Sequence, residues 1–249
     1  MNYTIGITTF SKRKDFLKNL ISKIRKFTNE KILVCINGEK LNEFDELYRK
    51  DILKFFSEVD GVFPIFFTEI RGLSKMWNTL AIHSDTENIL IINDDLDIIS
   101  ENVFEDINKH INSKEYQGFT RINESFSHFL ISKKKLNELG YFDERLLGFG
   151  EEDGDIVYRC IKNKMLINSI NIFGLINIIS NIRQDAIEPG IGKYSKFNRS
   201  YIYEKKYQKD ISSNIRGMFD SPMKQVIEDT NCYPIESFFE KNKTLLLVK

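Results

Sequence analysis

Acidic residues gather in one glycine-containing segment, residues 140–155, which reads GYFDERLLGFGEEDGD. Six carboxylates occur from Phe142 to Asp155, and Gly148 and Gly150 lie among them. Glycine lets a loop approach a ligand closely, and clustered carboxylates are the groups that a general base or a metal site requires. The segment therefore predicts a ligand-binding loop. The alternative is an acidic first turn of a helix that is expected to begin near Asp155.

A second acidic group follows the apolar segment 88–92, which reads NILII. The next residues, 93–97, read NDDLD. Carboxylate oxygens select Mg²⁺ or Mn²⁺, and a cation held there could neutralise a diphosphate. An acidic strand-to-helix turn with a helix-capping Asp is the structural alternative. The pattern alone leaves both interpretations open.

Strand-like and helix-like segments alternate over the first 112 residues. The expected strands are residues 3–8, 31–36, 62–68 and 88–92. The expected helices are residues 12–27, 41–56, 72–84 and 102–112. Such alternation is typical of a mostly parallel sheet, and ligands bind these sheets beyond the carboxyl ends of the strands. Polar side chains are therefore expected to share one edge, the predicted cleft: Thr8, Thr9, Asn37, Asp94 and Asp95.

Composition and charge exclude several classes of protein. Lys plus Arg and Asp plus Glu both number 36, and this balance argues against a dedicated nucleic-acid binder. The sequence has no run of 18 apolar residues and no signal-peptide core. Its three cysteines are widely separated and form no CxxC pair, which argues against a disulfide framework. We therefore expect a cytoplasmic protein, with contact at the cytoplasmic face of the inner membrane as an open alternative.

Together, the two acidic groups resemble the inverting family 2 glycosyltransferases of the GT-A fold. Members of this family carry a loop of the form GxFDExxxGxGxEDxDxxxR, which matches residues 140–159, and a DxD-type motif, to which residues 93–97 are similar. The segments GITTFSKR and RGLSKMWNTLA fit the family's nucleotide-binding stretches. The resemblance covers residues 3–165.

The resemblance implies roles for the acidic loop. Asp153 would be the general base, which takes the proton from the acceptor hydroxyl. Glu152 would bind the acceptor sugar, together with Gly150 and Phe149. The remaining carboxylates of the segment, Asp143, Glu144 and Asp155, are expected to be structural.

The resemblance also implies roles at the strand ends. Asp95 would be the principal metal ligand, with Asp97 as a second. The nucleotide sugar would be bound by Thr8, Thr9, Asn37, Arg71, Asn93 and Asp94. Family members commonly place a uracil-reading Asp where this chain has Asn37, and many GT-A enzymes take a metal ligand from a downstream His. All three histidines here precede the acidic loop. We therefore expect the metal to be held mostly by Asp95, the diphosphate and water.

These observations predict an α/β protein with the GT-A fold, a mostly parallel central sheet flanked by helices. A catalytic domain is expected over residues 1–180, with a nucleotide-sugar half at about 1–100 and an acceptor half at about 101–180. Residues 181–249 are expected to form a C-terminal lid or helical extension.

The expected function is metal-dependent, inverting transfer of a hexosyl or N-acetylhexosaminyl group, with Mn²⁺ or Mg²⁺. The donor would be a nucleotide sugar, and a UDP-sugar is the one that we expect. The acceptor would be a glycan or lipid-linked oligosaccharide in the synthesis of a bacterial capsule or lipopolysaccharide. No nucleic-acid partner is expected. Two alternatives remain: a nucleotidyltransferase of similar architecture, and a glycan- or nucleotide-binding module without catalysis.

Overall fold

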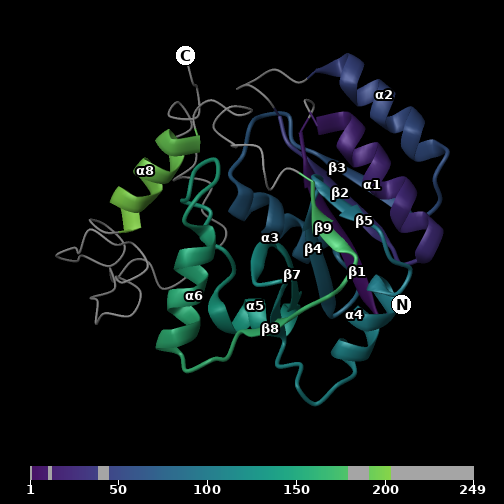
Figure 1. Cartoon of the computed structure of the whole chain (residues 1–249). Coiled ribbons are helices and arrows are strands. Elements are labelled where there is room, and N and C mark those ends of the chain that lie inside the picture. The colour runs from purple at the N-terminus through teal and green to yellow at the C-terminus, as the bar shows by residue number, and fades with distance from the viewer. Residues whose placement is uncertain (1, 11–12, 39–44, 179–190, 203–249) are drawn as a thin grey trace.

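The structure is a computed structural model, and it describes residues 2–10, 13–38, 45–178 and 191–202. Within these ranges a seven-stranded sheet, with the order β3-β2-β1-β4-β7-β6-β8, runs through the molecule. Helices pack on both sides of it (Figure 1). A second sheet pairs two short strands, β5 (Leu96–Ile98) and β9 (Leu175–Asn177).

The first half of the large sheet is parallel. It contains β1 (Tyr3–Thr9), β2 (Ile32–Ile36), β3 (Val62–Phe66) and β4 (Asn88–Asn93). The second half starts with β7 (Ser125–Ser132), which is antiparallel to β4. Strand β6 (Phe119–Ile122) is antiparallel to β7, and β8 (Asn168–Ile170) is parallel to β6. The prediction of a mostly parallel sheet flanked by helices is confirmed.

Two apolar cores lie on opposite faces of the sheet. One face is covered by α1 (Lys14–Phe27), α2 (Glu46–Ser57) and α4 (Val103–Ile111). The other is covered by α3 (Leu73–His83), α5 (Lys133–Leu139) and α6 (Glu152–Lys162). In β4, Leu90 and Ile92 enter the first core, whereas Ile89 and Ile91 enter the second. Burial on both sides explains why the four residues between Asn88 and Asn93 are all apolar.

Two local predictions are corrected by the structure. The acidic segment after β4 turns at residues 94–95 and continues into β5, so the alternative of a strand-to-helix turn is wrong. Helix α6 begins at Glu152 rather than near Asp155, because the left-handed backbone of Glu151, with φ 78°, immediately precedes it.

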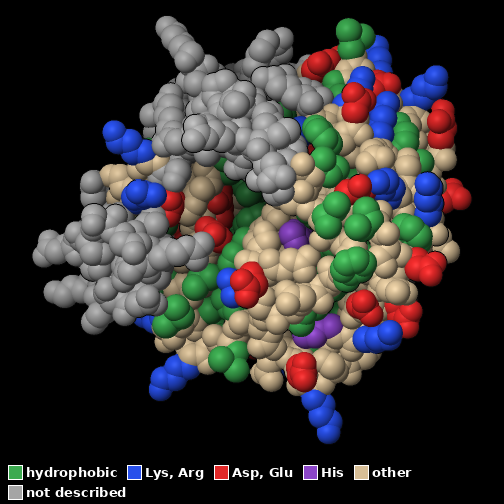
Figure 2. All heavy atoms as spheres, in the orientation of Figure 1, with side chains coloured by type: hydrophobic (Ala, Val, Ile, Leu, Met, Phe, Trp, Pro, Cys, Tyr) green, Lys and Arg blue, Asp and Glu red, His purple; other side chains and the backbone are tan. Residues whose placement is uncertain are grey.

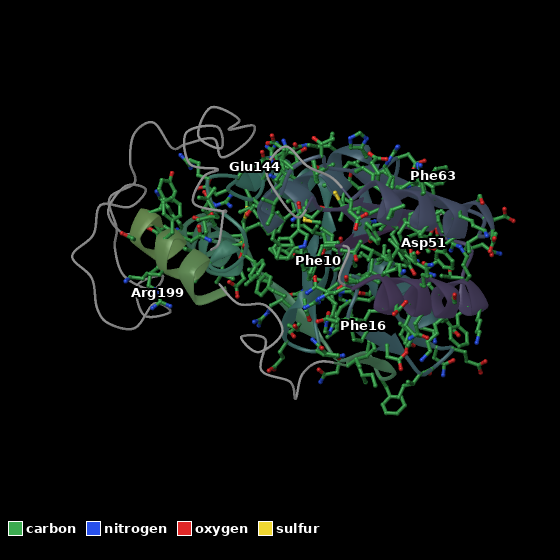
Figure 3. All side chains as sticks on the ribbon, turned by 90° about the horizontal axis from the view of Figure 1, so that it is seen from above. Phe10, Phe16, Asp51, Phe63, Glu144 and Arg199 are labelled. Carbon is green, nitrogen blue, oxygen red and sulfur yellow. The ribbon has the colours of Figure 1, made fainter. Side chains whose placement is uncertain are left out.

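Little of the expected C-terminal extension, residues 181–249, lies within the described residues. The part that does contains helix α8 (Ile191–Tyr201), which is placed near α6 (Figure 1). Figure 3 shows Arg199 of α8 at one side of the molecule and Asp51 and Phe63 at the other, with Phe10 between them. Across the described ranges, no helix has the length and hydrophobicity needed to cross a membrane.

Candidate functional site

The carboxyl ends of β1 and β4 bring polar side chains together. The parallel register places Thr8 opposite Asn93, and the Thr8 hydroxyl lies 3.4 Å from the Asn93 amide oxygen. The next residue, Thr9, donates a hydrogen bond of 2.6 Å to Asp94. We call these four residues, together with Asp95 and Arg13, the strand-end cluster.

Arg13 occupies the centre of the strand-end cluster. It stands immediately before α1, and its Nη1 lies 3.0 Å from a carboxylate oxygen of Asp94 and 3.0 Å from one of Asp95. All three side chains are more than nine-tenths buried. The sequence motifs did not single out Arg13, although it closes the segment GITTFSKR. A basic residue shortly after a strand that faces paired carboxylates is the signal that could have found it.

The electrostatics of the strand-end cluster suit a cation. Burial raises the pKa of Asp94 to about 7, against the charge of Arg13 and the hydrogen bond from Thr9, which lower it. One carboxylate oxygen of Asp95, Oδ1, is buried and has no hydrogen-bond partner among the described residues. An unpartnered buried carboxylate oxygen is costly unless a cation or a donor meets it. The residues present therefore fit a divalent ion at Asp95.

Asp97 does not join this cluster. It lies in β5, and its carboxylate accepts from the ammonium of Lys23 and from the Ile98 backbone N–H. Lys23 follows Arg13 by ten residues, which is about 15 Å along an α-helix. The contact with Lys23 therefore holds Asp97 away from the strand-end cluster. In the described part of the chain, no group of three or more His, Cys, Asp or Glu residues is placed to hold a metal.

Asn37, directly after β2, is hydrogen-bonded to Arg71, which lies in the segment between β3 and α3. The Asn37 amide donates to the Arg71 carbonyl at 2.9 Å, and the Asn37 side-chain oxygen accepts from the Arg71 N–H at 2.8 Å. Both ends of the Asn37 side chain are thus engaged with backbone. Asn37 therefore holds the backbone of Arg71 beside the end of β2.

The acidic loop, residues 140–153, packs against the start of α3. The Leu73 N–H donates to the Gly148 carbonyl at 2.6 Å. A Cβ added at Gly72 would lie only 2.5 Å from the Leu146 carbonyl oxygen, so the close approach requires glycine. Gly150 has φ 110°, which L side chains rarely adopt. Both glycines are needed for the observed path of the loop.

The two neighbouring acids at the start of α6 have different environments. Glu152 is buried, and its two carboxylate oxygens accept the Gly150 N–H at 2.9 and 2.7 Å. Burial, supplemented by the charges of Asp153 and Glu151, raises its pKa to about 8. Asp153 is only half-buried, and one of its oxygens accepts from the Gly154 N–H at 2.8 Å. Asp153 is therefore the acid of this pair that a substrate can reach more easily.

The other carboxylates of the acidic segment have internal partners. Asp143 pairs with Arg145 at 2.7 Å, and Asp155 pairs with Arg159 at 2.8 Å. Glu144 accepts from Asn78 at 2.9 Å. These contacts accord with the structural roles expected for the three acids.

Acidic side chains nevertheless remain accessible at this end of α6. Figure 2 shows them gathered in a hollow of the visible face, where α6 approaches α8. Phe149 is partly buried and packs against Leu147, as do Ile70 and Phe197. Residue Asn198, also on α8, is hydrogen-bonded to the acidic loop. It lies beyond the part of the sequence that carries the family resemblance.

No protein-family model and no curated protein matches this sequence, but solved structures do. The mannosyltransferase PcManGT from Pyrobaculum calidifontis, in complex with GDP-Man and Mn²⁺, is 11% identical with a TM-score of 0.61. Glucosyl-3-phosphoglycerate synthase from Mycobacterium tuberculosis, in complex with Mn²⁺, UDP and glucosyl-3-phosphoglycerate, is 11% identical with a TM-score of 0.56. TarS from S. aureus is 12% identical with a TM-score of 0.56. The fold is the GT-A fold.

The extent of these GT-A matches differs. The alignments cover 75% of this chain and 59% of the mannosyltransferase, and 80% of this chain and 79% of the synthase. For TarS they cover 88% of this chain and 42% of that chain. The chain thus spans less than two thirds of the mannosyltransferase and of TarS. At these identities the likeness shows the GT-A fold alone.

Proposed function

We propose that this chain is a metal-dependent, inverting glycosyltransferase that moves a sugar from a nucleotide sugar to an acceptor hydroxyl. One observation carries the proposal. In a GT-A fold, the chain combines a buried strand-end cluster that fits a cation with an accessible Asp153 beside the buried Glu152. Family 2 membership is part of the same proposal, and it is supported by the match of residues 140–159 to the family's acidic loop.

On the donor side, the strand-end cluster would bind the nucleoside diphosphate. Asp95 would hold Mn²⁺ or Mg²⁺, whose charge stabilises the negative charge that develops on the leaving diphosphate. Arg13 keeps the paired carboxylates in place by bridging them. Thr8, Asn93 and Asp94 lie at the same strand ends and are proposed to contact the ribose and diphosphate. Asp97 is engaged by Lys23 and is left out of this proposal.

The nucleobase site is proposed at the ends of β2 and β3. The side-chain amide of Asn37 is already hydrogen-bonded to the backbone of Arg71. Asn37 therefore contributes to this site by fixing that backbone. A UDP-sugar is the first donor to test, and a GDP-sugar is the second, since solved structures of this fold contain UDP and GDP-Man.

On the acceptor side, Asp153 would act as the general base. It would take the proton from the acceptor hydroxyl while that oxygen attacks the anomeric carbon and the bond to the diphosphate breaks. A single displacement of this kind inverts the configuration and needs no enzyme nucleophile. Burial raises the pKa of Glu152 to about 8, which reduces the negative charge that this group places beside Asp153 near neutral pH. Gly150 and Phe149 are proposed to border the acceptor.

The proposed product is a surface glycan of the capsule or lipopolysaccharide type, assembled by hexosyl or N-acetylhexosaminyl transfer. The proposed acceptor is a glycan or a lipid-linked oligosaccharide. Synthesis would then take place in the cytoplasm, at the inner face of the membrane. A catalytic domain over residues 1–180 with a C-terminal extension remains the proposed division of the chain.

The decisive experiment is a donor screen with Mn²⁺. The full chain is incubated with UDP- and GDP-sugars, and release of the nucleoside diphosphate is measured together with the shift in melting temperature. We expect one donor to release its nucleoside diphosphate and to stabilise the protein, because a ligand that binds only the folded state raises its stability. Stabilisation by none of the donors would contradict the proposal.

The same assay, extended to nucleoside triphosphates with a sugar 1-phosphate and to glycan acceptors, distinguishes the alternatives. A nucleotidyltransferase would release pyrophosphate from a nucleoside triphosphate when a sugar 1-phosphate is added. A binding module would be stabilised by a nucleotide sugar, but it would release no nucleoside diphosphate in the presence of any glycan acceptor.

A further inference from the structure

Asn198 of α8 is hydrogen-bonded to the backbone of the acidic loop at three points. Its side-chain oxygen accepts the Leu147 N–H at 2.7 Å. Its amide donates to the Leu147 carbonyl at 2.9 Å and to the Gly150 carbonyl at 2.7 Å. Asn198 is fully buried. Buried backbone groups of a loop need partners, and here a side chain from a distant segment supplies them.

Aromatic contacts on both sides of Asn198 hold α8 against the loop. Phe197 packs with Leu147 in a small apolar cluster that also includes Phe149. The guanidinium of Arg145 lies 5.4 Å from the centre of the Tyr201 ring, which is within the range of a favourable cation–π contact. The amide contacts of Asn198 thus lie in a packed interface.

A second buried asparagine binds the other end of the acidic loop. Asn78 of α3 donates to the Phe142 carbonyl at 2.9 Å and accepts from the Phe142 N–H at 3.0 Å. It is also fully buried. One asparagine therefore fixes each end of the loop, and only Asn78 lies within the segment that carries the family resemblance.

We propose that Asn198 is a positioning residue for the acidic loop, and that α8 supports the catalytic site through this side chain. The inference rests on the proposed role of Asp153 as the base. Asn198 binds the Gly150 carbonyl, the Gly150 N–H binds the carboxylate of Glu152, and Asp153 is the next residue. Each link is a short contact between buried or partly buried groups. A displacement of Gly150 therefore moves the proposed base.

The test replaces Asn198 with Asp. The variant Asn198→Asp keeps the side-chain shape and the oxygen that accepts from Leu147, but it turns a second oxygen toward the carbonyls of Leu147 and Gly150. We expect the amides of residues 147–150 to exchange with solvent at least about tenfold faster, because lost buried hydrogen bonds lower the local opening free energy. With the donor found in the screen, kcat should fall by about 10- to 100-fold, since small displacements of reacting groups are costly. The KM for the nucleotide sugar should change less than about threefold, because the strand-end cluster is untouched.

Lys196→Ala provides a matched control, because Lys196 is exposed on the same helix. It should change neither the exchange nor kcat. If Asn198→Asp does not fold, Asn198→Ala removes the same donor without adding charge, and the same two measurements apply. Unchanged exchange at residues 147–150, or an equal acceleration over the whole chain, would overturn the positioning role. The exchange measurement needs no substrate, so it decides this inference even if no sugar donor is found.

An equal effect on kcat and on the affinity for the nucleotide sugar would also overturn it, since that result indicates a general loss of structure. Faster exchange at the loop with an unchanged kcat would overturn the link to catalysis.

Discussion

The strand-end cluster and the acidic loop are held in place by different means. In the cluster, the parallel pairing of β1 with β4 sets Thr8 opposite Asn93, so backbone hydrogen bonds fix the positions. The acidic loop pairs with no strand, and buried side chains fix its path. Asn78 binds the loop at Phe142, near its start, and Asn198 binds it at Gly150, near its end.

This difference predicts how each region responds to substitution. A sheet keeps its register when a side chain at its end is replaced, so changes in the strand-end cluster should alter binding and leave the backbone in place. A loop held by side chains loses geometry when one of them is replaced. Substitutions in the two regions should therefore separate donor affinity from turnover.

The largest effect is expected from Asp153→Asn. Loss of a general base costs up to about 10⁴-fold in rate, and the substitution leaves the strand-end cluster untouched. We expect kcat to fall by that order, while the dissociation constant for the nucleotide sugar stays within about twofold. Rates of transfer and calorimetric titration of the donor check both quantities. A variant with retained activity would remove Asp153 as the base.

Asp95→Asn, in contrast, should weaken donor binding and turnover together. The buried Oδ1 of Asp95 is the proposed ligand of the divalent ion, and removing one electrostatic stabiliser of a leaving group costs about 10²-fold or more in rate. We expect the Mn²⁺-dependent rise in melting temperature with a nucleotide sugar to disappear together with activity. Donor binding that is as strong and as Mn²⁺-dependent as in the unsubstituted protein would place the metal elsewhere. Asp97→Asn is the matched comparison, because Asp97 pairs with Lys23 instead.

The same contrast explains how much could be predicted from the sequence. The apolar run before Asn93 predicted β4, and the alternation of elements predicted which strand ends meet, because a parallel register leaves little choice. The pairing of Arg13 with Asp94 and Asp95 joins residues about eighty positions apart. Periodicity carries no information on such a contact.

The acidic loop was less predictable. Its composition and its glycines indicated a ligand-binding loop, but the backbone of Glu151 moves the start of α6 to Glu152. No periodic pattern and none of the family's motifs includes Asn198, so the sequence does not distinguish it from an exposed asparagine. Short strands such as β6 and β8 were missed because three or four residues show no clear alternation.

A smaller effect, on stability, is expected from Glu152→Gln. Burial raises the pKa of Glu152 to about 8 in the folded protein, whereas in the unfolded chain the group releases its proton near its ordinary value. Between these values the folded state binds more protons, so Glu152 makes stability fall as pH rises, by at most about 1.4 kcal/mol per pH unit. Gln does not titrate and should remove this fall. Urea unfolding of both proteins at pH 6 and pH 8 measures the difference, and equal pH dependence would contradict the shift.

The smallest effect is expected from Arg199→Ala, next to Asn198 in the sequence. The Arg199 Nη2 lies 3.5 Å from Oε1 of Glu151, and the side chains are 47% and 9% exposed, respectively. A pair this long whose cation is exposed to solvent contributes about 1 kcal/mol or less. We expect the free energy of unfolding to change by less than about 1 kcal/mol, and kcat to stay within about twofold. Both measurements should be made beside Asn198→Asp. A loss from Arg199→Ala as large as that from Asn198→Asp would mean that charge at the surface, rather than the buried amide, holds the loop against α8.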